Sequence, residues 1–127
     1  MALGVDNLKL AVCPSSPNCV SSDAVDNDHH IQPFRLAVPP VEAWRTTQDL
    51  VAALPRTKIV TAEDDYLHAK CRSAVFGFVD DLELHLRPGE GIIAVRSAAQ
   101  VGYSDFGVNR KRLERLRTKL IQKGVIE

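Results

Sequence analysis

The 127-residue sequence lacks any long hydrophobic run. No stretch approaches the roughly 20 consecutive apolar residues that a membrane-spanning helix needs. The amino terminus also lacks a basic segment followed by an apolar core, so the sequence shows no signal peptide. A leader that had been removed would leave the same sequence. Membrane association through an amino-terminal segment that is absent here therefore stays open.

Net charge is absent too, because sixteen Lys and Arg residues balance sixteen Asp and Glu residues. Such a chain has no overall field that attracts nucleic acid or an anionic membrane. We therefore expect no nucleic acid as a partner, although the balance leaves room for a local basic patch. The apolar fraction of 45% and the charged fraction of 25% are those of an ordinary globular domain, and the length fits one domain.

Familiar catalytic and metal-binding motifs are also missing. The sequence contains no H-E-x-x-H, G-x-S-x-G, phosphate loop or dinucleotide fingerprint, which disfavours a known type of enzyme but does not exclude a new one. The three cysteines (Cys13, Cys19 and Cys71) form no C-x-x-C pair, so a structural zinc site is not expected. We interpret the polar run at 26–30 as a solvated loop, and we expect neither a metal nor a cofactor.

Proline and hydrophobic spacing divide the chain into an arm and a body. Residues 1–30 show the apolar period of neither a helix nor a strand, so we expect an irregular amino-terminal arm and a single α+β domain over residues 31–127. In this domain Pro39-Pro40 opens a helix and Pro55 closes it. The residues expected on its buried side are Val41, Trp44, Val51 and Leu54. A second helix is expected over 108–123, with Leu113, Leu116 and Leu120 on its apolar side.

Between the two helices the hydrophobic period changes to two. The predicted strands span residues 31–36, 58–62, 66–73, 81–86 and 92–97. Alternation of apolar and polar residues, with short turns between strands, indicates antiparallel pairing with one face on the core. Both helices need an apolar surface to cover. We therefore predict a two-layer α+β fold, in which a four- or five-stranded, mainly antiparallel sheet carries two helices on one face.

Three stretches of the sequence resemble a known family. They are Cys13-Pro-Ser-Ser-Pro-Asn-Cys-Val-Ser-Ser22, Arg72-Ser73 leading to Gly77-Phe78-Val79-Asp80-Asp81, and Val95-Arg-Ser-Ala98 running into residues 101–112. Together they resemble the domain-of-unknown-function family numbered fourteen ninety-nine, over about residues 10–118. The resemblance implies neither a reaction nor a substrate. Because many relatives look exported or membrane-anchored, it favours such a location, and a cytoplasmic location stays open.

Cys13 and Cys19 are close enough in sequence to form a small ring. A bond between them would close a loop of seven residues and pin the arm, with a stabilisation of about 2 kcal/mol. We predict this disulfide for an oxidising compartment. The alternative is two reduced cysteines in a cytoplasmic loop. A catalytic role is disfavoured, since no histidine partner can be assigned from the spacing.

A short sequence element occurs twice. Arg72-Ser73-Ala74 is followed by Gly77-Phe78-x-Asp80, and Arg96-Ser97-Ala98 is followed by Gly102-Tyr103-x-Asp105. We expect each copy to end a strand at Arg-Ser and then to present an aromatic residue and a carboxylate. In one interpretation the two arginines brace the fold through ion pairs with Asp80 and Asp105. In the other, both guanidinium groups lie beside one phosphate or carboxylate ligand.

The second predicted helix is strongly basic, with seven Lys and Arg residues against one acidic residue, Glu114. Its early Arg110-Lys111-Arg112 cluster opposes the helix dipole, so we expect a partner such as the acidic run at 80–83. The free N–H groups at the helix start would favour an anion. The residues of the predicted anion site are Arg72, Arg96, Tyr103, Asp105, Asn109 and Arg110.

Two classes of function fit these features. The leading hypothesis is a non-catalytic binding or accessory domain for a small anionic ligand or a protein partner. The alternative is an uncharacterised hydrolase or isomerase that uses His68 with one of three carboxylates, Asp80, Asp81 or Asp105.

Overall fold

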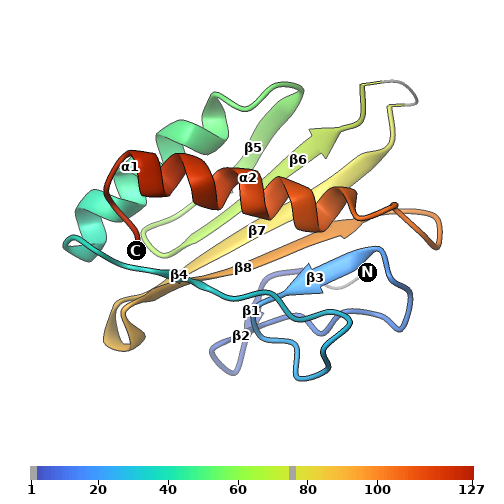
Figure 1. The fold of residues 1–127 in the computed structure, drawn as a ribbon, viewed down its shortest axis with the longest axis horizontal. Helices are drawn as coiled ribbons and strands as arrows, with labels where there is room; N and C mark the ends of the chain where they lie inside the picture. Colours follow the sequence, from blue (N-terminus) through green and yellow to red (C-terminus); the bar gives the residue numbers. More distant parts are fainter. Residues whose placement is uncertain (1–2, 75–76) are drawn as a thin grey trace.

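The computed structural model of the chain is a twisted sheet with two helices lying across one face (Figure 1). It describes residues 3–74 and 77–127, so the first two residues of the predicted arm lie outside it. The strands are β1 (Val5–Asp6), β2 (Lys9–Leu10), β3 (Cys19–Ser21), β4 (Phe34–Arg35), β5 (Thr57–Ala62), β6 (Tyr66–Arg72), β7 (Val79–Arg87) and β8 (Ile92–Ala99). The helices are α1 (Pro40–Ala52), α2 (Val108–Gln122) and the short 3-10 helix η1 (Pro88–Glu90).

Every strand pair among the described residues is antiparallel, which confirms the predicted α+β class. The main sheet has the order β3-β8-β7-β6-β5, and β4 pairs with one end of β8. In the described part of the chain this sheet has six strands, where the sequence predicted four or five. The additional strand is β3, which comes from the arm and pairs with β8. A three-residue strand is too short to show an alternating pattern.

Both helices place an apolar side on the sheet. Leu113, Leu116 and Leu120 of α2 are fully buried, as predicted. In α1 the prediction for Val41 is wrong, because this side chain is 69% exposed. The buried side of α1 runs through Ala43, and residues two apart on a helix point to nearly opposite sides.

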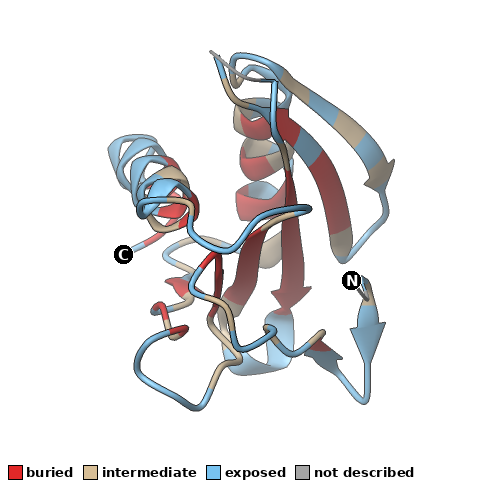
Figure 2. Cartoon of the chain, turned by 90° about the vertical axis from the view of Figure 1, so that its right-hand side faces the viewer, coloured by how far each residue is buried: buried red, intermediate tan, exposed pale blue. Residues whose placement is uncertain are grey.

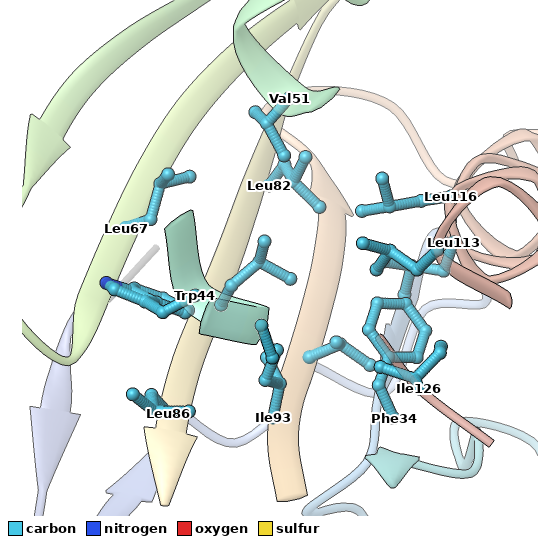
Figure 3. Close-up of a cluster of buried hydrophobic side chains, with 14 of the residues drawn as sticks. Phe34, Trp44, Val51, Leu67, Leu82, Leu86, Ile93, Leu113, Leu116 and Ile126 are labelled. Carbon is cyan, nitrogen blue, oxygen red and sulfur yellow. The ribbon is translucent and has the colours of Figure 1, made fainter. Parts of the chain in front are cut away.

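The core lies between the helices and the central strands (Figure 3). Leu82, Leu84 and Leu86 of β7 all face it, which confirms the predicted register. Burial of each such leucine stabilises the fold by about 1.5–3 kcal/mol. Trp44 of α1 packs in the same cluster, and its indole N–H donates a hydrogen bond to the Glu63 carbonyl at 3.0 Å.

The opposite face of the sheet is buried as well, although its residues are polar. Asp81, Glu83 and His85 of β7 are all buried. The amino-terminal segment reaches this face, because the Gly4 backbone N–H donates to the Glu83 carboxylate and the three short strands β1, β2 and β3 lie within the arm. Figure 2 shows the buried strands with α2 on one side and the amino-terminal hairpin on the other. The division of the chain at residue 30 stays a prediction.

The arm is fastened to itself and to the sheet. Cys13 and Cys19 form a disulfide with a Cα–Cα distance of 5.7 Å, which confirms the predicted pair. Further along, the guanidinium of Arg87 donates two hydrogen bonds to the Asp23 carboxylate, at 2.8 and 2.7 Å. Burial raises the pKa of Asp23, but the hydrogen bonds from Arg87 and from the Leu10 backbone N–H together outweigh this effect and leave the pKa below its usual value. The same carboxylate accepts the Leu10 backbone N–H at 2.9 Å.

Candidate functional site

The six residues of the predicted anion site do not all converge, because Arg72 and Arg96 lie apart from Asp105, Asn109 and Arg110 at the start of α2. Arg96 is fully buried in the middle of β8, and its guanidinium lies 3.1 Å from the Glu83 carboxylate on β7. Arg72 is the last residue of β6 and is exposed. The two copies of the doubled element are therefore not equivalent strand ends. The expected pairing of Arg96 with Asp105 is replaced by its pairing with Glu83.

Glu83 is a buried carboxylate with several donors. Besides Arg96, it accepts the Tyr66 hydroxyl at 2.6 Å and the Gly4 backbone N–H at 2.7 Å. Burial raises the pKa of the Tyr66 hydroxyl, and the hydrogen bond to Glu83 raises it further. A buried charge is tolerated only where it is paired and hydrogen-bonded. This cluster joins β6, β7, β8 and the arm, and we assign it a structural role.

The start of α2 already binds a carboxylate of the chain itself. The Asp105 carboxylate accepts the backbone N–H of Gly107 at 2.8 Å and that of Asn109 at 3.1 Å. It also accepts the Asn109 side-chain N–H at 2.7 Å. Arg110 donates to the carbonyls of His30 and Asp28, at 2.9 and 3.3 Å. The N–H groups and the guanidinium that were expected to hold a ligand are thus engaged within the fold, and Tyr103 lies exposed in the preceding loop.

Arg72 belongs instead to a basic cleft between α2 and the adjoining ends of β5 and β6. The cleft has a volume of about 310 Å³. Its basic lining residues are Arg56, Arg72, Arg112, Arg115 and Lys119. The remaining described residues that line it are neutral: Leu54, Pro55, Thr57 and Cys71. We use the name basic cleft for this hollow and its five basic residues.

Two parts of the fold bring these five cations together. Arg112, Arg115 and Lys119 follow one another at spacings of three and four, so they share one side of α2. Facing them, Arg56 and Arg72 are held together across the β5–β6 pair. The Arg72 backbone N–H donates to the Arg56 carbonyl at 2.9 Å, and the Arg56 Nε–H donates to the Arg72 carbonyl at 3.2 Å.

The charge of the cleft is largely uncompensated. Arg112 forms an ion pair with Asp80 at 2.8 Å. Among the described residues, no carboxylate forms an ion pair with any of the other four basic side chains. The like charges around this hollow repel each other. A bound anion would be attracted to each of them and would offset that repulsion.

Of the five basic residues of this cleft, only Arg72 was among the predicted site residues, and Arg56, Arg112, Arg115 and Lys119 were missed. Arg115 and Lys119 had a signal, since the second helix was seen to be basic and their spacing from Arg112 is helical. Arg56 had none, because it follows Pro55 in a turn that shows no pattern. The expectation that the early basic cluster of the helix has an acidic partner is confirmed by the pair between Arg112 and Asp80.

A second hollow lies beside the basic cleft and has a different lining. It has a volume of about 490 Å³ and lies between the described residues next to the ends of β6 and β7 (Ser73, Ala74 and Phe78) and the β8–α2 loop. Its large apolar residues are Phe78, Val101, Phe106 and Val108, and all four are exposed to solvent. We call this surface the apolar hollow. Asp80 and Asp105 also line it.

A comparison with known families places the chain. Residues 9–120 match the model of a family described as "Protein of unknown function (DUF1499)". The chain belongs to this family. No curated protein and no solved structure matches it. All residues of the basic cleft and of the apolar hollow lie within the matched part of this DUF1499 domain.

The residues considered for catalysis in this DUF1499 domain do not form one group. His68 meets Asp81, with Nε2 and a carboxylate oxygen 2.7 Å apart, and both side chains are buried. Asp80 lies on the other face of the sheet beside Arg112, and Asp105 binds the start of α2. Among the described residues, no group of three or more His, Cys, Asp or Glu is placed to hold a metal ion. No helix of the described chain is long and apolar enough to cross a membrane.

Proposed function

We propose that this DUF1499 domain is a non-catalytic binding domain whose basic cleft holds the phosphate or carboxylate group of an anionic ligand. The proposal depends on one observation: Arg56, Arg72, Arg115 and Lys119 surround one hollow without a carboxylate partner among the described residues. The planar fork of each arginine matches the geometry of phosphate and carboxylate oxygens. A hydrogen bond to a charged group contributes about 1.5–3 kcal/mol.

The lining of the cleft favours binding over chemistry. General acid–base catalysis most often uses a histidine or a carboxylate within reach of the substrate. None of the described residues that line the cleft is a histidine, an aspartate or a glutamate. Cys71 lies at its buried side, where the Thr57 hydroxyl donates to its sulfur at 3.5 Å. The described residues that line the cleft include no general base that could take a proton from this thiol.

Isothermal titration with inorganic phosphate at low ionic strength tests the proposal. We expect saturable binding of one phosphate per chain. The double variant Arg115→Ala/Lys119→Ala should weaken this binding about ten-fold or more, because it removes two charged donors. Both side chains are exposed, so the variant should fold normally.

A second double variant, Lys111→Ala/Lys123→Ala, is the matched control. It removes two positive charges from the same helical segment, and both lysines are exposed and lie outside the cleft lining. It should keep the phosphate affinity of the unmodified protein within about two-fold. Equal losses in the two variants would mean that only net charge matters, and no saturable binding at all would rule out the anion site.

A further inference from the structure

The basic cleft and the apolar hollow are adjacent, as two pairs of their lining residues show. Arg112 lines the cleft and Asp80 lines the hollow, and these two side chains form an ion pair at 2.8 Å. Arg72 and Ser73, which are consecutive in sequence, line the cleft and the hollow respectively. β6 ends and α2 begins at the same end of the sheet (Figure 1), and residues from both places line each hollow. A ligand longer than a single anion can reach from one to the other.

The apolar hollow presents side chains that a globular fold normally covers. Phe106 is 90% exposed, and its backbone has a φ of 55°. A bulky residue seldom adopts this left-handed conformation, and such conformations cluster at ligand-binding segments. The 490 Å³ of the hollow lies in the range of about 300–1,000 Å³ that is typical of small-molecule sites.

We propose that the ligand of this domain is a single-chain anionic amphiphile. Its phosphate or carboxylate group binds in the basic cleft, and its alkyl chain lies in the apolar hollow. This inference rests on the proposed function, because the cleft must first bind the anion.

The charges at the two hollows give the ligand one orientation. Asp105 lines the apolar hollow, and its carboxylate would repel an anionic group placed there. In the cleft the same group meets four cations that lack a carboxylate partner among the described residues. The Asp80 charge is balanced by Arg112. The boundary between the two hollows therefore carries no unpaired charge from these two residues, and an alkyl chain can lie across it. An amphiphile bound in the reverse direction would place its chain among the cations and its anion beside the Asp105 carboxylate.

A series of alkyl phosphates, from butyl to octyl and each used below its micelle concentration, tests this inference by titration calorimetry. Affinity should rise about two- to four-fold for every added methylene, and four-fold is the change that corresponds to about 0.8 kcal/mol per buried CH₂. Inorganic phosphate is the reference without a chain, and octanol is the reference without a charge. Octanol should bind at least about ten-fold more weakly than octyl phosphate.

Three variants separate the contribution of the alkyl chain from that of the anionic head group. Phe106→Asn should reduce the gain with chain length and leave the affinity for inorganic phosphate unchanged. Asparagine tolerates the left-handed backbone at this position, so the loop should keep its shape. Val101→Ser, at a second exposed position, should act in the same direction. Arg115→Ala/Lys119→Ala should weaken every member of the series by a similar factor.

The outcomes distinguish this inference from the proposed function. If inorganic phosphate and octyl phosphate bind equally well, the amphiphile is ruled out and the anion site stands. If neither binds, both proposals fall. If octanol binds as well as octyl phosphate, the cleft and the hollow are not used together. If the protein sediments with vesicles containing an anionic phospholipid but binds no monomeric alkyl phosphate, the surface recognises a membrane, and the single-chain ligand is wrong.

Discussion

Arg112 and Asp80 form an ion pair of 2.8 Å that stands between the basic cleft and the apolar hollow. The two side chains are 13% and 10% exposed, so each has been largely removed from water. Arg112 also donates to the Asn109 side-chain oxygen at 2.8 Å, which fixes the guanidinium at the edge of the cleft. The pair thus holds α2 against β7. It also neutralises the charge of Arg112, which would otherwise add to the positive charge of the cleft.

Asp80→Asn should therefore separate stability from binding. Loss of the charged partner should lower the free energy of unfolding by about 1–3 kcal/mol. The same change leaves Arg112 unneutralised, so phosphate should bind about three- to ten-fold more tightly. Urea denaturation and phosphate titration measure the two effects. Glu114→Gln is the control, since it makes the same change of charge in an exposed ion pair with Arg117, which is worth about 0–1 kcal/mol. A loss of both stability and phosphate binding in Asp80→Asn would contradict this account.

The ion pair between Glu83 and Arg96 should behave as a structural element. Arg96→Met leaves the Glu83 charge without its ion-pair partner in a site with no solvent access. We expect the free energy of unfolding to fall by about 3–5 kcal/mol. The double variant Glu83→Gln/Arg96→Met should recover part of this loss, because it removes both charges. Arg72→Met, at the exposed arginine of the doubled element, should change the stability by less than about 0.5 kcal/mol. Similar small losses at both arginines would refute the structural role, and urea denaturation of the three variants decides it.

The disulfide between Cys13 and Cys19 should stabilise the arm by a modest amount. Closing a ring of this length contributes about 2 kcal/mol by constraining the unfolded chain. Cys13→Ser/Cys19→Ser should lower the free energy of unfolding by that amount. Cys71, the free cysteine of the described chain, should be the one thiol that titrates after denaturation without reductant. Three titratable thiols in protein from an oxidising compartment would show that the bond does not form there.

The stability of the arm should depend on the protonation of His29. This ring lies 2.8 Å from the Ser16 carbonyl through Nε2, and its Nδ1 faces the Asp26 carboxylate. The Ser16 carbonyl and then the Asp26 carboxylate raise the pKa of His29 above its usual value of 6.5. A group whose pKa is raised in the folded state stabilises that state fully below its unfolded pKa. The stabilisation is lost as the pH rises through the folded pKa.

Comparison with His29→Gln isolates this contribution. The difference in free energy of unfolding between the two proteins should be largest near about pH 5.5 and should shrink as the pH rises above about 6.5. His85 titrates with the opposite sign, because burial and then Arg87 lower its pKa. Its effect cancels in the difference, since both proteins contain it. Urea denaturation across this range checks the prediction, and a difference that does not change with pH would contradict it.

Local patterns predicted the frame of this fold well. The leucines at 82, 84 and 86 and those of α2 repeat with the period of their element, and this period alone assigns their buried side. The cysteine pair was predictable from its short spacing. Val41 was assigned to the wrong side because its spacing of three from Trp44 suggests a shared face, whereas the buried side of α1 also runs through Ala43, two positions away.

The partners of polar residues could not be predicted in the same way. Arg96 meets Glu83 because β7 and β8 pair in one particular register, and the arm then buries that pair. The doubled element predicted Asp105 as its partner from similarity of sequence alone. The basic cleft joins Arg56 to residues of α2 that lie more than fifty positions away in sequence. The proximity of Arg56 to these α2 residues depends on the direction in which α2 crosses the sheet. No local sequence pattern specifies that direction.

The most direct test of the basic cleft is a titration of the isotopically labelled protein with inorganic phosphate, followed by amide nitrogen–proton NMR. We predict saturable shifts that share one dissociation constant and are centred on Arg56, Arg72, Arg115 and Lys119. The amides of Lys111 and Lys123, which serve as the control positions, should move much less. Shifts of equal size along the whole of α2 that never saturate would contradict a discrete anion site in this DUF1499 domain.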